Sequence, residues 1–174
     1  MKFAPDIRKT RTDSPLGTII LAATDQGLAG VWFADQKHQP DWQDWPDRAA
    51  DPTLEQAITE LHQYFDGGRT GFDVPLDLRG GTPFQQSVWH ALLRIPFGVC
   101  TTYGTLGDAL GRPKAVRAVG TAIGRNPLGI IVPCHRVLGA DGSLTGYAGG
   151  LGRKAALLTL ESDARRAGQP APTA

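Results

Sequence analysis

The stretch GIIVPCHRVLG, residues 129–139, decides how the rest of the chain is interpreted. A short apolar run ends in Pro133, and Cys134, His135 and Arg136 follow it directly. Pro133 disfavours helical backbone at Val132, so we expect the chain to enter Cys134 in an extended conformation. The apolar residues 129–132 are expected to be a buried, strand-like segment. The residues after Pro133 are expected to begin a helical turn. The thiol is a buried structural group, half of a disulfide, a metal ligand or an activated nucleophile.

Length and composition limit the class of protein. The chain has 174 residues, enough for one ordinary domain or two small ones, and its 41% hydrophobic content supports a core. No run approaches the ~20 apolar residues that span a bilayer. The first residues, MKFAPDIRKTRTDSPLG, lack the apolar segment of a signal peptide. We therefore expect a soluble, cytoplasmic protein of bacterial type, in which thiols stay reduced.

The cysteine and histidine pattern argues against two of the four roles for Cys134. In a reducing compartment, Cys100 and Cys134 are not expected to pair. The sequence has no CxxC, HxxxH or HExxH spacing, and its 4 histidines are scattered at positions 38, 62, 90 and 135. We therefore predict no structural zinc site.

Charge is distributed unevenly along the chain. Residues 1–79 contain 8 Lys and Arg against 13 Asp and Glu, a balance of −5, whereas residues 80–174 contain 10 against 4, a balance of +6. This asymmetry favours an anionic partner for the second half, although solvated surfaces without such a partner can have a similar charge balance.

Residues 1–79 are predicted to form a small α/β scaffold domain without a chemical motif. Strand-like runs at 17–24 and 28–34 flank a short loop at 25–27. A polar loop at 35–51 contains two tryptophans, Trp42 and Trp45, which are expected to pack against the sheet. Asp51 would cap a helix that Gly67 ends, and residues 72–78 alternate like a half-buried edge strand.

Residues 80–165 are predicted to form a second, mainly helical domain. Thr82 and Gln85 have the spacing of a capping box that begins a helix. Two short helices follow, in TYGTLGDAL (102–110) and KAVRAVGTAIG (114–124), and the glycine-containing turn between them suggests a helix-turn-helix. Residues 166–174 are expected to be a flexible tail. The predicted fold class is therefore α/β, of the α+β kind.

The second of these two helices has an unusual face. Val116, Val119 and Ile123 are expected to point inward, whereas Arg117, Gly120, Thr121 and Gly124 share the other side. A glycine inside a helix costs about 1 kcal/mol, so two of them require a reason. Close packing against another helix and close approach to DNA explain them equally well.

The neighbours of Cys134 favour a reactive thiol. Unpaired backbone N–H groups and two potentially cationic side chains favour the thiolate, whereas Cys100, without charged neighbours, resembles an ordinary buried cysteine. Adjacent residues do not face each other on a helical turn, so a proton would pass from Cys134 to His135 through a water. The histidine would then need an orienting carboxylate, for which Glu161 is the natural candidate.

These motifs together resemble a known family. IIVPCHRV, preceded by VRAVGTAIGRNP and followed by GYAGGLGRKAALLTLE, is similar to the O6-alkylguanine-DNA alkyltransferases, also called methylated-DNA–protein-cysteine methyltransferases. The resemblance is strong over residues 80–162 and looser through SPLG and FDVPLDL in the first half. It implies a ribonuclease H-like first domain and a DNA-binding, catalytic second domain with a helix-turn-helix.

The implied activity is DNA repair by direct reversal, without metal or cofactor. The enzyme would transfer a methyl or larger alkyl group irreversibly from O6-alkylguanine, and also from O4-alkylthymine, in flipped-out DNA. Cys134 would accept the group once, and His135, oriented by Glu161, would act as base through a water. Asn126 would be a hinge that braces the active-site backbone, and Tyr103 would stand by the rotating nucleotide and help to protonate the departing guanine.

The resemblance also implies how DNA is held. Arg117 would fill the gap left by the flipped base, and the Gly120 face would lie in the minor groove of duplex DNA bound by a monomer, alone or cooperatively. The expected DNA contacts include Ala115, Thr121, Arg125 and Tyr103, and the expected pocket residues are Val137, Tyr147, Ala148 and Gly149. Some family members have a cysteine-rich zinc site or a serine at position 148, and this chain has neither.

Two other classes of protein share parts of this pattern. A non-catalytic damage sensor would keep the helix-turn-helix, but related sensors lack the cysteine that is present here. A cysteine hydrolase would use a Cys–His pair, but the sequence offers no motif for an oxyanion hole.

Overall fold

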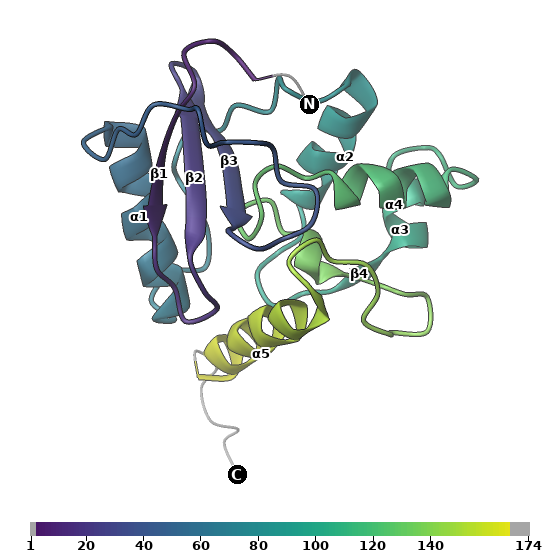
Figure 1. The fold of residues 1–174 in the computed structure, drawn as a ribbon. Helices are drawn as coiled ribbons and strands as arrows, with labels where there is room; N and C mark the ends of the chain where they lie inside the picture. Colours follow the sequence, from purple (N-terminus) through teal and green to yellow (C-terminus); the bar gives the residue numbers. More distant parts are fainter. Residues whose placement is uncertain (1–2, 168–174) are drawn as a thin grey trace.

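The fold joins a three-stranded sheet to a helical half. The computed structural model describes residues 3–167. Strands β1 (Arg8–Thr12), β2 (Ile19–Thr24) and β3 (Gly27–Phe33) form an antiparallel sheet in the order β1-β2-β3. Helix α1 (Pro52–Phe65) covers one face, and the helical half lies beyond the β3 edge of the sheet (Figure 1).

The helical half is built around a short 3-10 turn. It contains α2 (Pro83–Leu92), α3 (Tyr103–Ala109), α4 (Val116–Gly124), the 3-10 helix η1 (Cys134–Arg136) and α5 (Leu151–Ala167). The two-residue strands β4 (Thr101–Thr102) and β5 (Val137–Leu138) pair in parallel. No helix in the described part of the chain is long and apolar enough to cross a membrane.

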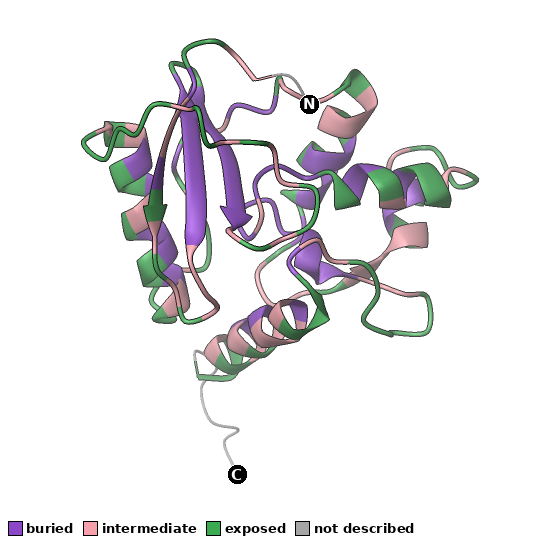
Figure 2. Cartoon of the chain, viewed as in Figure 1, coloured by how far each residue is buried: buried purple, intermediate pink, exposed green. Residues whose placement is uncertain are grey.

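The two halves share one apolar core. Buried residues from β2, β3 and α1 contact those of α2, α4, α5 and the segment 128–137 in a single cluster. Figure 2 shows β2, β3 and the central turn of the helical half as the most completely buried parts. A second cluster lies beneath the polar loop, where Trp32 of β3 packs against Trp42 and Trp45 as predicted.

Most predicted elements are present. The runs 17–24 and 28–34 form β2 and β3, Asp51 caps α1 by accepting from the amides of Thr53 and Leu54, and Thr82 and Gln85 form a reciprocal capping box. Strand β1 was not predicted because its sequence, RKTRT, has no apolar alternation. Helix α5 continues to Ala167, past the predicted start of the tail at 166, and residues 168–174 lie outside the described part.

The predicted strand at 72–78 is wrong. Only an isolated bridge between Leu76 and Leu28 forms there. The backbone amides of Asp73 and Val74 instead donate to the Glu60 carboxylate at 2.9 and 3.2 Å. Because these amides are already bonded to a side chain, the segment cannot continue as a ladder.

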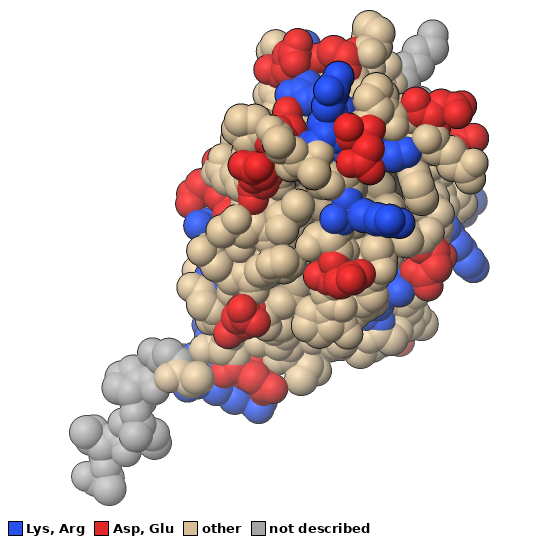
Figure 3. Space-filling model, turned by 60° about the vertical axis from the view of Figure 1, so that its left-hand side comes forward, with Lys and Arg blue, Asp and Glu red and all other residues tan. Residues whose placement is uncertain are grey.

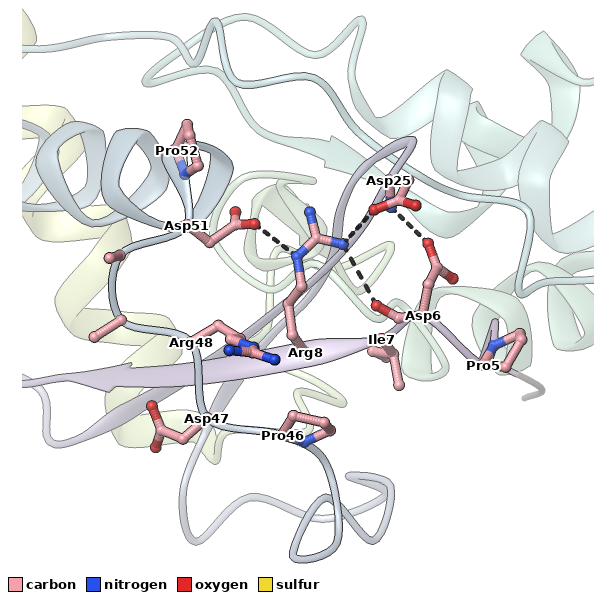
Figure 4. Close-up of a pocket in the computed structure, with 12 residues that line it drawn as sticks. Pro5, Asp6, Ile7, Arg8, Asp25, Pro46, Asp47, Arg48, Asp51 and Pro52 are labelled. Atoms are coloured by element: carbon pink, nitrogen blue, oxygen red, sulfur yellow. Dashed lines mark hydrogen bonds and ion pairs between the residues drawn. The ribbon is translucent and has the colours of Figure 1, made fainter.

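The surface hollow beside β1 is occupied by an internal ion network. It has a volume of about 690 Å³ and lies between the start of the chain and the segment 46–52. Figure 4 shows Arg8 reaching across it, with bonds of 2.6 Å to Asp51 and 2.8 Å to Asp25. Acidic and basic side chains also alternate over the face on the α1 side in Figure 3, which therefore carries no patch of one sign.

Candidate active site

Cys134 is the first residue of η1 and is 8% exposed. The predicted strand at 129–132 is wrong, because these residues form a tight turn. Ile130 has a positive φ of 71°, and the Val132 amide donates to the Leu128 carbonyl at 2.8 Å. The predicted helical turn after Pro133 is present as η1. Cys134 is therefore displayed at the end of a compact turn packed against β3.

Asn126 holds this turn in place. Its Nδ2 donates to the Val132 carbonyl at 2.8 Å, and its Oδ1 accepts from the Leu128 amide at 3.0 Å. The residue is buried and directly follows the C-terminal end of α4. One side chain therefore links the end of α4 to the backbone that carries Cys134.

The electrostatic environment of the thiol differs from the expected one. Burial raises the pKa of Cys134, and a hydrogen bond from Asn126 and the charge of Lys154 act in the opposite direction. Arg136 faces away and pairs with Glu161 instead. The thiol therefore requires a base to become a nucleophile near neutral pH.

Lys154 is a site residue that sequence reasoning missed. It is fully buried on α5, and its Nζ donates to the carbonyls of Val137 and Thr145, each at 2.6 Å. These bonds close the loop that follows the active-site turn. A lysine within GRKAALLTLE resembles an ordinary helix-surface residue, so no local signal marked it.

His135 and Glu161 meet as predicted. His135 Nε2 lies 2.8 Å from Glu161 Oε1, and both side chains are completely buried. Burial lowers the pKa of His135, so the imidazole is neutral at neutral pH even beside a carboxylate. Its other nitrogen, Nδ1, has no hydrogen-bond partner among the described residues.

Glu161 is the most heavily bonded group of the site. Besides His135, it accepts from Arg136 Nε and Nη2 at 2.9 and 2.8 Å, from the Gly98 amide at 2.9 Å and from the Tyr64 hydroxyl at 2.8 Å. Burial alone would raise its pKa, but hydrogen bonds from His135 and Arg136 lower the pKa to about 2. Glu161 is therefore a fixed anion that orients the imidazole.

The predicted pocket residues lie on β5 and on the loop between β5 and α5. Tyr147 is close enough for the charge of Cys134 to raise its pKa, in addition to the larger effect of burial. Gly149 is buried where a Cβ would clash with the Tyr147 ring. Val137 is buried in β5, and the Ala148 carbonyl accepts from the Lys37 amide at 3.1 Å.

Tyr103 lies at the start of α3, at the edge of the same loop. Its hydroxyl donates to the carbonyls of Thr145 and Gly146 at 3.3 and 3.5 Å. Its ring faces the Gly120 position of α4. Tyr103 therefore stands between α4 and the pocket loop, the segment between β5 and α5 that carries Tyr147, Ala148 and Gly149.

Helix α4 presents an exposed face that agrees with most of the prediction. Val119 and Ile123 are buried, whereas Arg117, Thr121, Gly124 and Arg125 are exposed. The inward assignment of Val116 is wrong, because it is 41% exposed at the first turn of the helix. Ala115 is the N-cap residue and makes no side-chain capping bond.

The two glycines of α4 are not required by helix packing. A Cβ at Gly124 would meet nothing within 4 Å, and one at Gly120 would meet only the Tyr103 ring at 3.7 Å. Alanine would therefore fit at both positions, and it would stabilise the helix. Close packing against another helix therefore does not require these glycines, and close approach to DNA stays a prediction.

Cys100 and Cys134 are both free thiols. The expectation that Cys100 is an ordinary buried cysteine is wrong, because Cys100 is exposed, whereas Cys134 is buried. Among the described residues, no group of three or more His, Cys, Asp or Glu side chains could hold a metal ion.

Comparison with known families decides the identity. Residues 83–163 match the family model of the 6-O-methylguanine DNA methyltransferase DNA-binding domain, and residues 7–78 match the model of its ribonuclease-like domain. The chain belongs to the 6-O-methylguanine DNA methyltransferase family. The predicted family and fold class are thereby confirmed.

Individual members of this family are close in sequence and structure. A methylated-DNA–protein-cysteine methyltransferase of Mycobacterium bovis is 51% identical over 150 residues, 86% of this chain and 88% of the relative. A constitutive enzyme of the same name from Bacillus subtilis is 44% identical, over 87% of this chain and 93% of the relative. The crystal structure of Mycobacterium tuberculosis OGT in complex with DNA is 48% identical, with a TM-score of 0.81, and the match covers 91% and 93% of the two chains.

The low pKa of Glu161 predicts a specific acid sensitivity. Because its folded pKa is depressed from 4.5 to about 2, its contribution is complete above pH 4.5 and is lost as pH falls toward 2. The loss should reach about 3 kcal/mol in the free energy of unfolding. Denaturant unfolding between pH 5 and pH 2 should show a shallower decline for Glu161→Gln, which cannot titrate there. If the free energy of unfolding fell with pH equally in wild type and Glu161→Gln, the low pKa of Glu161 would be contradicted.

Proposed function

We propose that Cys134 accepts the alkyl group when this protein repairs O6-alkylguanine in duplex DNA. Membership in the family establishes the general activity, DNA repair by alkyl transfer to a cysteine. The observation that supports Cys134 is its place in η1, directly before a neutral, buried His135 that Glu161 holds at 2.8 Å. Cys100 is exposed and outside this network.

The chemistry follows from the state of each group. The buried thiol has a raised pKa, so His135 removes its proton through a water at Nδ1 while Glu161 fixes Nε2. The sulfur then forms a bond to the alkyl carbon as the bond from that carbon to guanine O6 breaks. Tyr103 helps to return a proton, so guanine leaves as a neutral base. The thioether has no easy return path, and each molecule therefore reacts once.

DNA must present its base outside the stack for this reaction. Extrusion costs a few kcal/mol, and insertion of a side chain into the gap offsets part of that cost. Arg117 is exposed on α4 and has the length for this role. The face with Gly120 and Gly124 lies against the minor groove, where the missing Cβ atoms allow close approach of the helix.

The remaining parts have supporting roles in the same proposal. Residues 1–79 and 80–165 act as an α/β domain and a DNA-binding catalytic domain within one monomer. Asn126 joins α4 to the turn of Cys134. Ala115, Thr121 and Arg125 contact the DNA backbone, and the base, O4-alkylthymine included, is received by a pocket of Val137, Tyr147, Ala148 and Gly149.

The first test identifies the acceptor atom. The protein is incubated with duplex DNA that contains O6-methylguanine, digested, and analysed by mass spectrometry of its cysteine peptides. One methyl group should appear on the peptide with Cys134 and none on that with Cys100. The Cys134→Ser variant should leave the DNA unrepaired, whereas Cys100→Ser should repair normally. Methylation elsewhere, or repair by Cys134→Ser, would sink the proposal.

Arg117→Ala should impair base flipping rather than chemistry. We expect the rate with duplex DNA to fall by about tenfold, which corresponds to one lost insertion contact. The rate with the free base O6-methylguanine should stay unchanged, because no stack has to be opened. Arg11→Ala on β1 removes the same charge from the opposite half and serves as the control. Equal losses on both substrates would contradict the role of Arg117.

Gly120→Ala should separate stability from DNA approach. The substitution should raise the free energy of unfolding by about 1 kcal/mol, because alanine favours the helix and finds room beside Tyr103. Repair of duplex DNA should nevertheless slow, because the new methyl group holds α4 away from the groove. Reaction with the free base is the internal control. A stabilised variant with full activity on duplex DNA would show that the glycine face does not approach DNA.

A further inference from the structure

Tyr64 connects the first half of the chain to the proposed catalytic network. It lies on α1, is fully buried, and donates its hydroxyl to Glu161 Oε1 at 2.8 Å across 97 residues of sequence. Its ring meets Phe97 edge-on at 6.1 Å between centroids, and Arg136 lies over that same Phe97 ring. The first half therefore contributes a polar group to a site whose other members come from the second half.

The oxygen that Tyr64 reaches is the one that orients His135. Three donors converge on Oε1, namely Tyr64 Oη, His135 Nε2 and Arg136 Nη2, each at 2.8 Å. A carboxylate has about four lone-pair sites, and Oε2 already accepts from Arg136 Nε and the Gly98 amide. The donors on Oε1 must therefore share its negative charge.

We propose that Tyr64 is a positioning residue that acts through Glu161 to keep the His135 imidazole neutral. The first half of the chain thereby takes part in the reaction. The inference rests on the proposed roles of His135 and Glu161. By holding part of the charge on Oε1, the hydroxyl limits how strongly Glu161 stabilises a protonated imidazole. His135 thereby stays neutral and available as a base.

The other charged groups around His135 and Glu161 are the same with and without the Tyr64 hydroxyl. The effect of that hydroxyl can therefore be measured by itself. Burial and Glu161 raise the pKa of Tyr64 far above its usual value, so the phenol remains a donor throughout the working range of pH. The other titratable and charged groups whose charge or bonds reach Tyr64, His135 or Glu161 are Arg136 on η1, Lys154 on α5, Tyr147 before α5 and Cys100 before β4, and Cys134 precedes His135 in the chain. None of these changes in a Tyr64→Phe variant.

The test is the pH dependence of single-turnover alkyl transfer to Cys134. Loss of the hydroxyl leaves more charge on Oε1 for His135, raises the pKa of the imidazole and depletes the neutral base at acidic pH. Tyr64→Phe should therefore move the acid limb of the rate profile upward by about half to one pH unit, as expected for one hydrogen bond. Rates on that limb should fall about three- to tenfold, and the plateau at higher pH should remain within about twofold of wild type.

Phe65→Leu is the matched control. Phe65 meets the Tyr64 ring at 5.5 Å, so this variant loosens the same aromatic cluster but leaves the hydroxyl in place. It should lower stability without moving the acid limb. The His135 imidazole should also be titrated by NMR in each full-length protein without DNA, where Tyr64→Phe alone should raise its midpoint.

Three outcomes bear on the inference. An unchanged limb and midpoint in Tyr64→Phe would overturn it, and an equal shift in Phe65→Leu would assign the effect to packing and overturn it as well. A shift confined to Tyr64→Phe supports it. Wild-type protein that places no alkyl group on Cys134 would instead refute the proposed function, and the NMR titration would still decide whether Tyr64 tunes His135.

Discussion

The buried carboxylate of Glu161 is the interaction on which the rest of the active site depends. A charge without solvent is costly unless paired and hydrogen-bonded, and this one has a donor at every accessible lone pair. The donors come from α1, from the loop before β4 and from η1. Because one group on α5 holds all three, the turn that carries Cys134 cannot shift without leaving an unpaired charge.

Burial of the Cys134 thiol and its reactivity have opposite requirements, and the surrounding side chains meet both. A buried cysteine is protected from solvent, but burial also raises its pKa and makes it a poor nucleophile. In the proposed reaction neutral His135 supplies a base, and Asn126 and Lys154, which lower the pKa of Cys134, stabilise the charge that forms on sulfur. Adjacent residues of a tight 3-10 turn point in different directions, so Cys134 can face the pocket while His135 faces Glu161.

Contacts that a chemical role requires could be predicted from the sequence. A histidine that acts as a base needs an orienting carboxylate, and that need predicted the contact between His135 and Glu161 across 26 residues. Strands and helix caps with local signals were also predicted. Segments 72–78 and 129–132 were predicted as strands and are not, because the side chains of Glu60 and Asn126 bind backbone groups there in place of a neighbouring strand. Tyr64 was hidden among the apolar residues of α1.

The first half of the chain, predicted to be scaffold, supports the site at two places. Tyr64 reaches Glu161, and Arg153 ties the pocket loop to the sheet side by donating to the carbonyls of Leu16 at 2.8 Å and Gly149 at 3.2 Å. The Arg153 guanidinium also lies 4.2 Å from the centre of the Phe33 ring on β3. The base and the pocket are thus both anchored across the same shared core. A separated second half would lose a hydrogen bond at Glu161 and the fixed position of the loop, so the site belongs to the whole fold.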